Sequence, residues 1–256
     1  MSGFLTVSFK DHFSGHAADY ARHRPQYPPA LFACLARLAP GRALAWDAGT
    51  GSGQAALGLA EHFARVIATD AAAQQIANAV PHARVEYRVA AAESLDAPAR
   101  SVDLLIAAQA AHWFDLARFY AEARRILKPH GVVAIWCYGL TRVAPEVDVI
   151  VEHFYRDVVG PFWPPERQFI DERYQTLPFP FAEQQPPEFR IETAWQLPDF
   201  MRYLCTWSAA RRYMAQHGAD PLQPLEQRLA QAWGARARPR VVRWPIHLRI
   251  GRVGAD

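Results

Sequence analysis

The chain has 256 residues, of which 51% are hydrophobic and 21% are charged, and its formal net charge at pH 7 is +3. This composition is typical of a globular protein with a large core, and it excludes a chain that is disordered as a whole. We find neither an apolar run of about 18 residues, the length of a membrane span, nor a basic segment followed by an apolar leader. We therefore predict a cytoplasmic protein that has no membrane partner and is not secreted.

The three cysteines are odd in number, far apart in sequence and set among apolar neighbours. This pattern does not indicate a disulfide framework, and it is typical of reduced thiols in the core of a cytoplasmic protein. The residues expected in the core are Cys34, Cys137 and Cys205.

Between residues 44 and 138, short apolar segments alternate with segments of helical periodicity. This alternation predicts βαβ units and a mostly parallel sheet. In chain order, the predicted strands are 44–46, 66–69, 85–89, 102–107 and 132–138. A helix is expected over 116–127, and a turn at 128–131 should end it. The last of these strands is apolar at every position, so it should be buried on both faces.

Residues 141–187 interrupt this pattern, because they are rich in proline and aromatic residues and show no clear strand. We predict an insertion that packs over the carboxyl edge of the sheet. Two interpretations of it stay open: a lid that closes over a ligand, and a structural cap over core residues that would otherwise be exposed. The whole chain, 1–256, is expected to form one domain that contains this insertion.

Two further strands are predicted at FRIETAWQL and VVRWPIHLRIG, on either side of a helix near 198–216. Pro245 lies inside the second strand and favours a sheet edge or a bulge, because proline has no N–H to donate. Six arginines and no acidic residue lie between Arg236 and Arg252. These arginines could line a groove that binds nucleic acid, or they could protect an edge strand from aggregation by their charge. We favour the second interpretation and predict no nucleic-acid partner.

A glycine loop is the most informative feature of the chain. In the segment LAWDAGTGSGQ, an acidic residue, Asp47, is followed by three glycines at alternate positions, Gly49, Gly51 and Gly53. Glycines between a strand and a helix let the backbone turn tightly and approach a ligand. The next predicted strand ends at Asp70, where a carboxylate can accept hydrogen bonds from a ribose diol. The spacing is G-x-G-x-G, which differs from the G-x-G-x-x-G of dinucleotide-binding proteins.

Together with Asp47, Asp70 and the alternating strands, this loop resembles that of the class I S-adenosylmethionine-dependent methyltransferases. The resemblance implies a doubly wound α/β fold with a mostly parallel seven-stranded sheet, and S-adenosylmethionine as the cofactor. The loop amides and Asp47 would face the amino acid arm of the cofactor, and Asp70 would face its ribose. The candidate cofactor-binding residues are Tyr20, Arg24, Asp47, Gly49, Thr50, Gly51, Gly53, Asp70, Ala71, Ala92, Glu93, Gln109 and Ala110.

The N-terminal segment HFSGHAADYARHRPQYP resembles the start of a narrower group, the type 11 methyltransferases similar to trans-aconitate methyltransferase. The resemblance implies an N-terminal helical cover in which Tyr20 and Arg24 close over the cofactor, and an ordinary surface helix is the alternative. One departure concerns Ala91, which stands where this group often has an acidic residue. Without that contact to the adenine amino group, we expect a lower cofactor affinity unless Glu93 replaces it.

The segment AAQAAHWFD, at the end of the fourth predicted strand, also resembles that group. Ligands lie at the carboxyl edge of an open α/β sheet, so Gln109 and Ala110 should border the sulfonium. His112 and Trp113 should point toward the methyl acceptor, together with Trp207 of the downstream segment YLCTWSAARRY. His112 is the candidate catalytic residue, either as a base or as a group that orients the acceptor. A structural histidine, hydrogen-bonded beside Trp113, is the alternative.

The predicted function is methyl transfer from S-adenosylmethionine to a small-molecule acceptor. A carboxylate acceptor, as in the trans-aconitate enzymes, would need no base. Two alternatives from other classes remain: a catalytically silent protein that binds S-adenosyl ligands, and a NAD-dependent oxidoreductase. No metal is predicted, because His12 and His16 have no third ligand nearby in the sequence. The sequence indicates neither the identity of the acceptor nor the oligomeric state.

Overall fold

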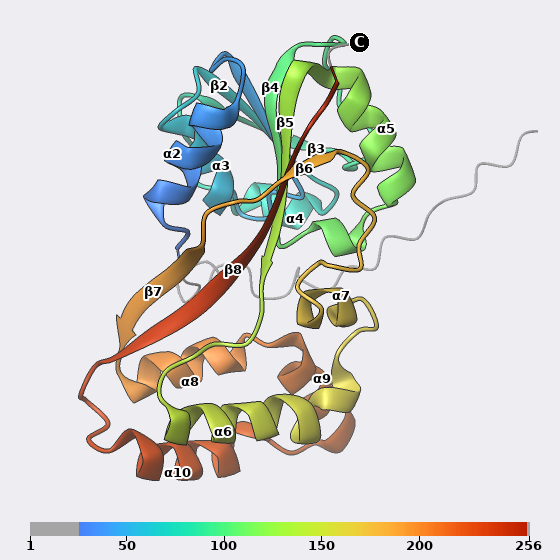
Figure 1. The fold of residues 1–256 in the computed structure, drawn as a ribbon. Helices are drawn as coiled ribbons and strands as arrows, with labels where there is room; N and C mark the ends of the chain where they lie inside the picture. The colour runs from blue at the N-terminus through green and yellow to red at the C-terminus, as the bar shows by residue number, and fades with distance from the viewer. Residues whose placement is uncertain (1–25, 255–256) are drawn as a thin grey trace, which may run out of the picture.

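A twisted sheet runs through the centre of the computed structural model, which describes residues 26–254 (Figure 1). Its strands are β1 (Leu44–Ala48), β2 (Arg65–Asp70), β3 (Val85–Val89), β4 (Val102–Ala108), β5 (Leu127–Tyr138), β6 (Ala182–Gln184), β7 (Phe189–Trp195) and β8 (Arg240–Arg252). The order across the sheet is β3-β2-β1-β4-β5-β8-β6, and β7 also pairs with β8. Strands β1 to β5 are parallel, and β8 is antiparallel to β5, β6 and β7.

The sheet has seven strand positions, and β6 and β7 share the outermost one. β6 pairs with residues 250–252 of β8, whereas β7 pairs with residues 240–246 of the same strand. The prediction of seven strands is therefore corrected to eight, because the last position is divided between two segments. β6 lies inside 141–187, where no strand was predicted. Its three residues are too few to show the alternation by which a strand is recognised.

Helices cover both faces of the parallel strands, which confirms the doubly wound α/β class (Figure 1). α2 (Pro29–Leu38) and α3 (Gln54–Ala60) pack on one face, and α5 (Leu116–Ile126) packs on the other. The short helix α4 (Ala73–Ala77) follows β2. Alternate residues of β5 contribute to the two resulting cores, so this strand is buried on both faces as predicted. β5 begins at Leu127, so the residues predicted as a turn form its irregular start, opposite a register shift in β4.

The remaining helices form a separate layer beyond the carboxyl ends of β4 and β5, which we call the helical layer (Figure 1). It consists of α6 (Pro145–His153), the π-helix η2 (Phe154–Val158), the short 3-10 helix η3 (Gly160–Phe162), α7 (Arg167–Asp171), α8 (Leu197–Cys205), α9 (Ser208–His217) and α10 (Leu222–Trp233). The prediction of one helix near 198–216 was wrong, because the chain breaks between α8 and α9. At that break Trp207 is extended, and its side chain is only 6% exposed. The helical layer therefore combines the insertion with residues 197–233.

β8 connects the helical layer to the sheet, and Pro245 lies at a point where the strand has a partner on one side only. There it pairs with Arg190 of β7, whereas the pairing with β5 begins one residue later, at Ile246. Arg243, two residues earlier, bonds with Arg142 on the β5 side, so the backbone nitrogen of Pro245 points to that side as well. β5 has already ended there. The missing N–H of Pro245 consequently removes no rung of the sheet.

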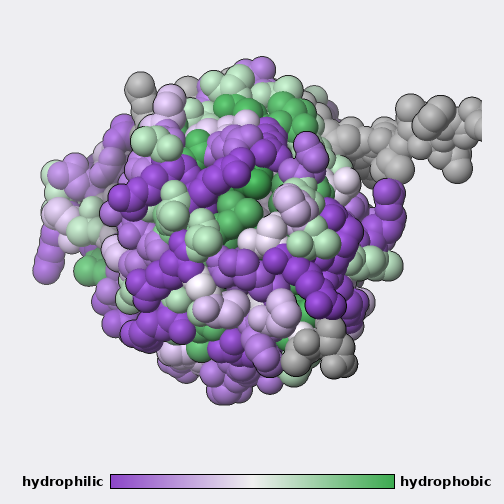
Figure 2. All heavy atoms as spheres, turned by 90° about the horizontal axis from the view of Figure 1, so that it is seen from above, coloured by the Kyte–Doolittle hydropathy of each residue, from purple (hydrophilic) through white to green (hydrophobic). Residues whose placement is uncertain are grey.

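Most arginines of the C-terminal region are paired with acidic residues, three of which come from distant parts of the chain. Arg236 pairs with Glu226, and the other pairs are Arg240 with Glu146, Arg243 with Glu192 and Arg249 with Glu183. Four of the six positive charges are therefore balanced locally. Figure 2 shows the face above the amino ends of the strands, which is mostly hydrophilic with small separate hydrophobic patches.

All three cysteines are free thiols, and two of them lie in the core as predicted. Cys34 and Cys137 are buried, but Cys205 is exposed, which corrects the prediction for that residue. Cys205 is the last residue of α8, where its apolar sequence neighbours turn to the opposite face of the helix. Between residues 26 and 254, no helix is both long enough and apolar enough to cross a membrane. In the same part of the chain, no three metal-ligating side chains are grouped to hold an ion.

Candidate functional site

The glycine loop joins β1 to α3, and all three of its glycines adopt positive φ angles. These angles are 69° at Gly49, 57° at Gly51 and 88° at Gly53, a region that disfavours residues with a Cβ. Two positions are also closely packed: a Cβ on Gly49 would lie 2.6 Å from the Cβ of Ala110, and one on Gly53 would collide with Tyr87. A Cβ on Gly51 would have no atom closer than 3.9 Å. The loop is thus open at Gly51 and tightly supported on both sides.

Asp47, next to the end of β1, carries a buried carboxyl group with an unused oxygen. Its Oδ2 accepts a hydrogen bond of 2.5 Å from the Thr50 hydroxyl, but its Oδ1 has no partner among the described residues and is sealed from solvent. Burial, reinforced by the charge of Asp70, raises the pKa of Asp47 to about 7 despite the Thr50 hydrogen bond. An ammonium group placed at Oδ1 would satisfy this oxygen and stabilise the carboxylate. The residues of the loop therefore fit the amino acid arm of S-adenosylmethionine.

Asp70, at the end of β2, holds two backbone segments in place. Its Oδ2 accepts a hydrogen bond of 2.8 Å from the N–H of Gly51, and its Oδ1 accepts one of 2.8 Å from the N–H of Ala72. The first bond fixes the glycine loop and the second fixes the turn that leads into α4. A carboxylate has about four acceptor sites, so hydrogen bonds to the backbone and to ribose hydroxyls are compatible at one aspartate. The sequence predicted the ligand contact but not this support of the loop.

We expect Asp70→Ala to weaken the binding of S-adenosylhomocysteine by about 1.5 to 3 kcal/mol, the range of hydrogen bonds to charged groups. Because the substitution also removes the acceptor for two backbone N–H groups, the free energy of unfolding should fall by about 1 to 3 kcal/mol. Asp70→Asn is the matched variant, since it retains one carbonyl oxygen and loses the charge. Calorimetry and chemical denaturation measure the two effects, and unchanged affinity in a folded Ala variant would show that Asp70 does not contact the ligand.

The other residues predicted around the adenine follow β2 and β3. Ala71 is exposed directly after β2, and Ala92 is buried after β3. Glu93 accepts a hydrogen bond of 2.9 Å from the backbone N–H of Asp115, at the start of α5, so one of its carboxylate oxygens stabilises the fold. Tyr20 and Arg24, together with His12 and His16, lie outside the described residues.

Gln109 joins the carboxyl ends of β4 and β5. Its side-chain amide donates a hydrogen bond of 2.9 Å to the carbonyl oxygen of Tyr138, and it accepts one of 3.0 Å from the N–H of the same residue. Its φ of 58° turns the chain away from the sheet. The amide of Gln109 thus adds a rung to the sheet, and Ala110, the next residue, packs against Gly49 of the loop. The predicted neighbours of the sulfonium lie where the loop and the end of β4 meet.

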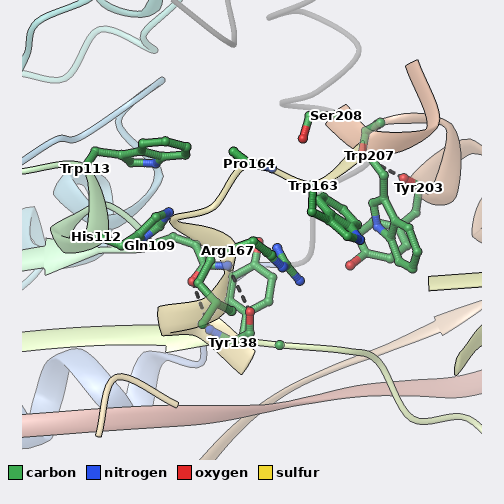
Figure 3. Close-up of a pocket in the computed structure, with 13 residues that line it drawn as sticks. Gln109, His112, Trp113, Tyr138, Trp163, Pro164, Arg167, Tyr203, Trp207 and Ser208 are labelled. Carbon is green, nitrogen blue, oxygen red and sulfur yellow. Dashed lines mark hydrogen bonds between the residues drawn. The ribbon is translucent and has the colours of Figure 1, made fainter. Parts of the chain in front are cut away.

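A pocket lies beside this edge, between the sheet and the helical layer (Figure 3). The sheet side contributes Gln109, His112, Trp113, Tyr138 and Gly139, the insertion contributes Trp163, Pro164, Arg167 and Ile170, and the chain around the α8–α9 break contributes Tyr203, Thr206, Trp207 and Ser208. The three residues predicted to contact the acceptor, His112, Trp113 and Trp207, therefore line one pocket, although Trp207 is far from the other two in sequence.

His112 lies in the 3-10 helix η1 (Ala111–Trp113), and its ring is held at the wall of the pocket. Its Nδ1 lies 2.6 Å from the hydroxyl oxygen of Tyr174, and its ring centre is 4.8 Å from that of Trp113. Burial, together with the positive charge of Arg167, lowers the pKa of His112 to about 3. The imidazole is consequently neutral at physiological pH.

Arg167, at the first position of α7, supplies a positive charge to the pocket. Its guanidinium carbon lies 4.5 Å from the ring centre of Trp163, and its Nε donates a hydrogen bond of 2.7 Å to the hydroxyl of Tyr155. The hydroxyl of Tyr155 in turn donates one of 2.5 Å to Asp171. In the described part of the chain, the two terminal nitrogens of Arg167 have no hydrogen-bond partner. Figure 3 shows this end of the side chain reaching into the pocket.

Arg167 and Tyr174 were not predicted from the sequence. Both belong to the insertion, and Tyr174 is separated from its partner His112 by 62 residues. The one available signal was a lone cationic residue within an aromatic and proline-rich segment, GPFWPPERQF. Such a segment is often a functional loop, but it does not show which residue faces the ligand.

The architecture and the loop define an α/β enzyme that binds its ligands at the carboxyl edge of the sheet. Comparisons with known proteins agree on the kind of enzyme. A family model described as a methyltransferase domain matches residues 46–135. A protein of Dictyostelium discoideum named as a methyltransferase is 34% identical over 231 residues, which cover 89% of this chain and 88% of that protein. A solved structure assigned as a type II methyltransferase from Anaeromyxobacter dehalogenans is 50% identical, with a TM-score of 0.87, and the match covers 91% of this chain and 99% of that one.

The chain therefore belongs to the class I S-adenosylmethionine-dependent methyltransferases. It is an enzyme, and S-adenosylmethionine is its cofactor. A Saccharomyces cerevisiae protein named as an S-adenosylmethionine-dependent methyltransferase is also similar, at 29% identity over 48% of this chain and 45% of that protein. The alternatives of a NAD-dependent oxidoreductase and a silent binding protein are not supported.

Proposed function

We propose that the enzyme transfers the methyl group of S-adenosylmethionine to a carboxylate oxygen of a small molecule. The observation that carries this proposal is Arg167, whose terminal nitrogens face the pocket without a protein partner among residues 26–254. A guanidinium presents two parallel N–H groups, which match the two oxygens of a carboxylate. The resemblance of the AAQAAHWFD segment to the trans-aconitate enzymes supports the same acceptor class.

Several residues would hold the cofactor beside this pocket. Asp47 would accept hydrogen bonds from the ammonium group of the amino acid arm, and Asp70 from the ribose hydroxyls. The backbone at Gly51 leaves room for the ligand, and Ala110 sits between the loop and the pocket. When bound, S-adenosylmethionine supplies a methyl group that its sulfonium has already activated.

The chain's task in the reaction is to align an in-line displacement. A carboxylate held by Arg167 would direct one oxygen at the methyl carbon, so that the C–O bond forms as the C–S bond breaks. The products are a methyl ester and S-adenosylhomocysteine, and no proton has to be removed. Correct alignment of two reactants can lower a barrier by roughly 7 to 11 kcal/mol. Trp163, Trp207 and the neighbouring aromatic rings would exclude water, which strengthens the attraction between Arg167 and the carboxylate.

The insertion 141–187 contributes to this arrangement as a cover of the acceptor. It carries Trp163, Pro164 and Arg167 over the ends of β4 and β5. We infer that the acceptor enters between the insertion and the α8–α9 break. In this proposal, the lid and the structural cap predicted from the sequence are the same segment, because its aromatic residues both bury core surface and line the pocket.

Two measurements test the proposed function. S-adenosylhomocysteine should raise the melting temperature whereas NADH should not, because a ligand that binds only the native state stabilises it. A panel of small carboxylic acids, phenols and amines is then assayed for S-adenosylhomocysteine formation. We expect product with one or more of the carboxylic acids, in the form of a methyl ester that alkaline treatment hydrolyses. Turnover with phenols or amines alone would overturn the carboxylate assignment.

A further inference from the structure

His112 and Tyr174 are both buried, so water does not compete for the hydrogen bond between their side chains. His112 is 8% exposed and Tyr174 is 0% exposed, and their polar atoms are 2.6 Å apart. A neutral imidazole carries its single proton on either Nδ1 or Nε2, and the role of His112 depends on which nitrogen it is. The hydrogen bond to Tyr174 determines this choice.

The direction of the bond follows from the proton of the tyrosine. Burial holds the pKa of Tyr174 well above its usual value, so the hydroxyl keeps its proton. Among the described residues, Nδ1 of His112 is the only group within hydrogen-bond distance that could accept the proton of this hydroxyl. If Nδ1 carried a proton and donated it, the hydroxyl proton would be buried without an acceptor, at a cost of about 1 to 3 kcal/mol. The hydroxyl therefore donates to Nδ1, and the imidazole proton lies on Nε2.

The other ring nitrogen is available to a ligand. Nε2 of His112 has no hydrogen-bond partner among residues 26–254, and it is not one of the unpartnered atoms that are sealed from solvent. Because His112 lines the pocket and its Nδ1 is engaged by Tyr174, Nε2 is the ring nitrogen that can present an N–H to a ligand there. A nitrogen that already carries a proton can donate a hydrogen bond, but it cannot remove a proton from an acceptor.

The backbone around Tyr174 is constrained in a way that fixes its hydroxyl. Arg173 and Tyr174 have φ angles of 58° and 60°, which are unusual for residues with a Cβ. Arg249 of β8 donates hydrogen bonds of 2.9 Å to the carbonyl oxygen of Tyr174 and 2.7 Å to that of Leu177. Its guanidinium is also paired with Glu183, which lies in β6. Backbone strain that neighbouring bonds maintain is a common feature of functional sites.

We propose that Tyr174 is a positioning residue, which locks His112 as the neutral tautomer that donates a hydrogen bond from Nε2 to the methyl acceptor. The role toward the acceptor rests on the proposed function, whereas the tautomer does not. His112 thus orients the acceptor and is not a base, which decides between the two roles that the sequence left open. The low pKa of His112 agrees with this assignment, because a protonated imidazole would have no lone pair for the Tyr174 hydroxyl.

The tautomer is tested by nuclear magnetic resonance of protein labelled with nitrogen-15 in histidine. The signals of His112 are identified among those of the ten histidines by comparison with the His112→Gln variant. We expect Nδ1 unprotonated and Nε2 protonated at every pH from about 5 to 9. In Tyr174→Phe, which keeps the ring and loses the hydroxyl, the Nδ1-protonated form should become detectable. A wild-type His112 that carries its proton on Nδ1, or that is charged at pH 7, would overturn the proposal.

The role toward the acceptor is tested with the carboxylic acid that gives most product in the panel. The glutamine of His112→Gln can place an N–H near the position of Nε2 but cannot act as a base. We expect this variant to retain at least about ten-fold more turnover than His112→Ala, and both to bind S-adenosylhomocysteine like the wild type. Equal loss in the two variants would overturn the donor role. If no carboxylic acid reacts, the proposed function fails, while the tautomer result still stands or falls on its own.

Discussion

Replacing Arg167 by leucine is expected to lower kcat/KM for the carboxylic acid substrate by about 100-fold or more. The substitution removes the positive charge that faces the pocket, and loss of one partner of a buried charge pair costs roughly 2 to 5 kcal/mol. The affinity for S-adenosylhomocysteine should stay within about two-fold, because Asp47, Asp70 and the glycine loop are unchanged. Steady-state kinetics and calorimetry measure the two quantities.

Two further variants separate charge from geometry. Arg167→Lys keeps the charge but loses the planar pair of N–H groups, so an intermediate loss is expected. Arg118→Leu removes an arginine that is exposed on α5, and it should behave like the wild type. If Arg167→Leu is folded and has the kcat/KM of the wild type, the carboxylate does not bind to this residue.

Asp47→Asn is expected to weaken the binding of S-adenosylmethionine by about 2 to 3 kcal/mol, since a neutral amide replaces the carboxylate that would face the ammonium group.

In the absence of ligand at pH 8, the free energy of unfolding of Asp47→Asn should be higher than that of the wild type. In the folded protein, burial raises the pKa of Asp47 to about 7, above its usual value of about 3.9. The unfolded chain therefore loses this proton first, and stability falls as the pH rises from about 4 to 7. Above about pH 7, the folded protein bears the full cost of burying the charged carboxylate, of the order of 4 kcal/mol.

The pH dependence supplies a control for this prediction. The difference in melting temperature between wild type and Asp47→Asn should be small near pH 4 and large near pH 8. At about pH 6 to 7, binding of S-adenosylmethionine to the wild type should release a fraction of a proton, because the ammonium group favours the charged carboxylate. Calorimetry in buffers of different ionisation enthalpy detects this release. A stability difference that does not change with pH would contradict the raised pKa of Asp47.

The part of the fold that the sequence predicts well is the part encoded by local patterns. The strands from β1 to β5 contain short runs of apolar or alternating residues between helical segments, and the glycine loop has its own spacing, so both were predicted. The helical layer was not predicted in detail, because its helices are short and are stabilised by aromatic packing between distant segments. The break at Trp207 is an example: the ring of Trp207 packs on those of Phe154, Tyr155 and Trp163, which belong to the insertion.

The same distinction holds for the site. Most of the cofactor candidates follow the carboxyl ends of β1 to β4, and the glycine loop with Asp47 has a recognisable spacing, so these positions could be predicted from the sequence. The acceptor side is built from contacts across long separations, such as that of His112 with Tyr174. In addition, Gln109 and Asp70 form hydrogen bonds with the backbone that no residue pattern indicates.

The position of β8 affects how the protein is made. β5 and β8 are neighbours in the sheet, but the helical layer and the rest of residues 139–239 lie between them in the chain. Closing a loop of about 100 residues costs roughly 4 kcal/mol of chain entropy before any contact is gained. While the chain emerges from the ribosome, the edge of β5 that pairs with β8 therefore has no partner until the final strand is made. An unpaired strand edge can form hydrogen bonds with a wrong strand. The helical layer that lines the acceptor pocket thus leaves this edge of β5 without its strand partner until translation reaches β8.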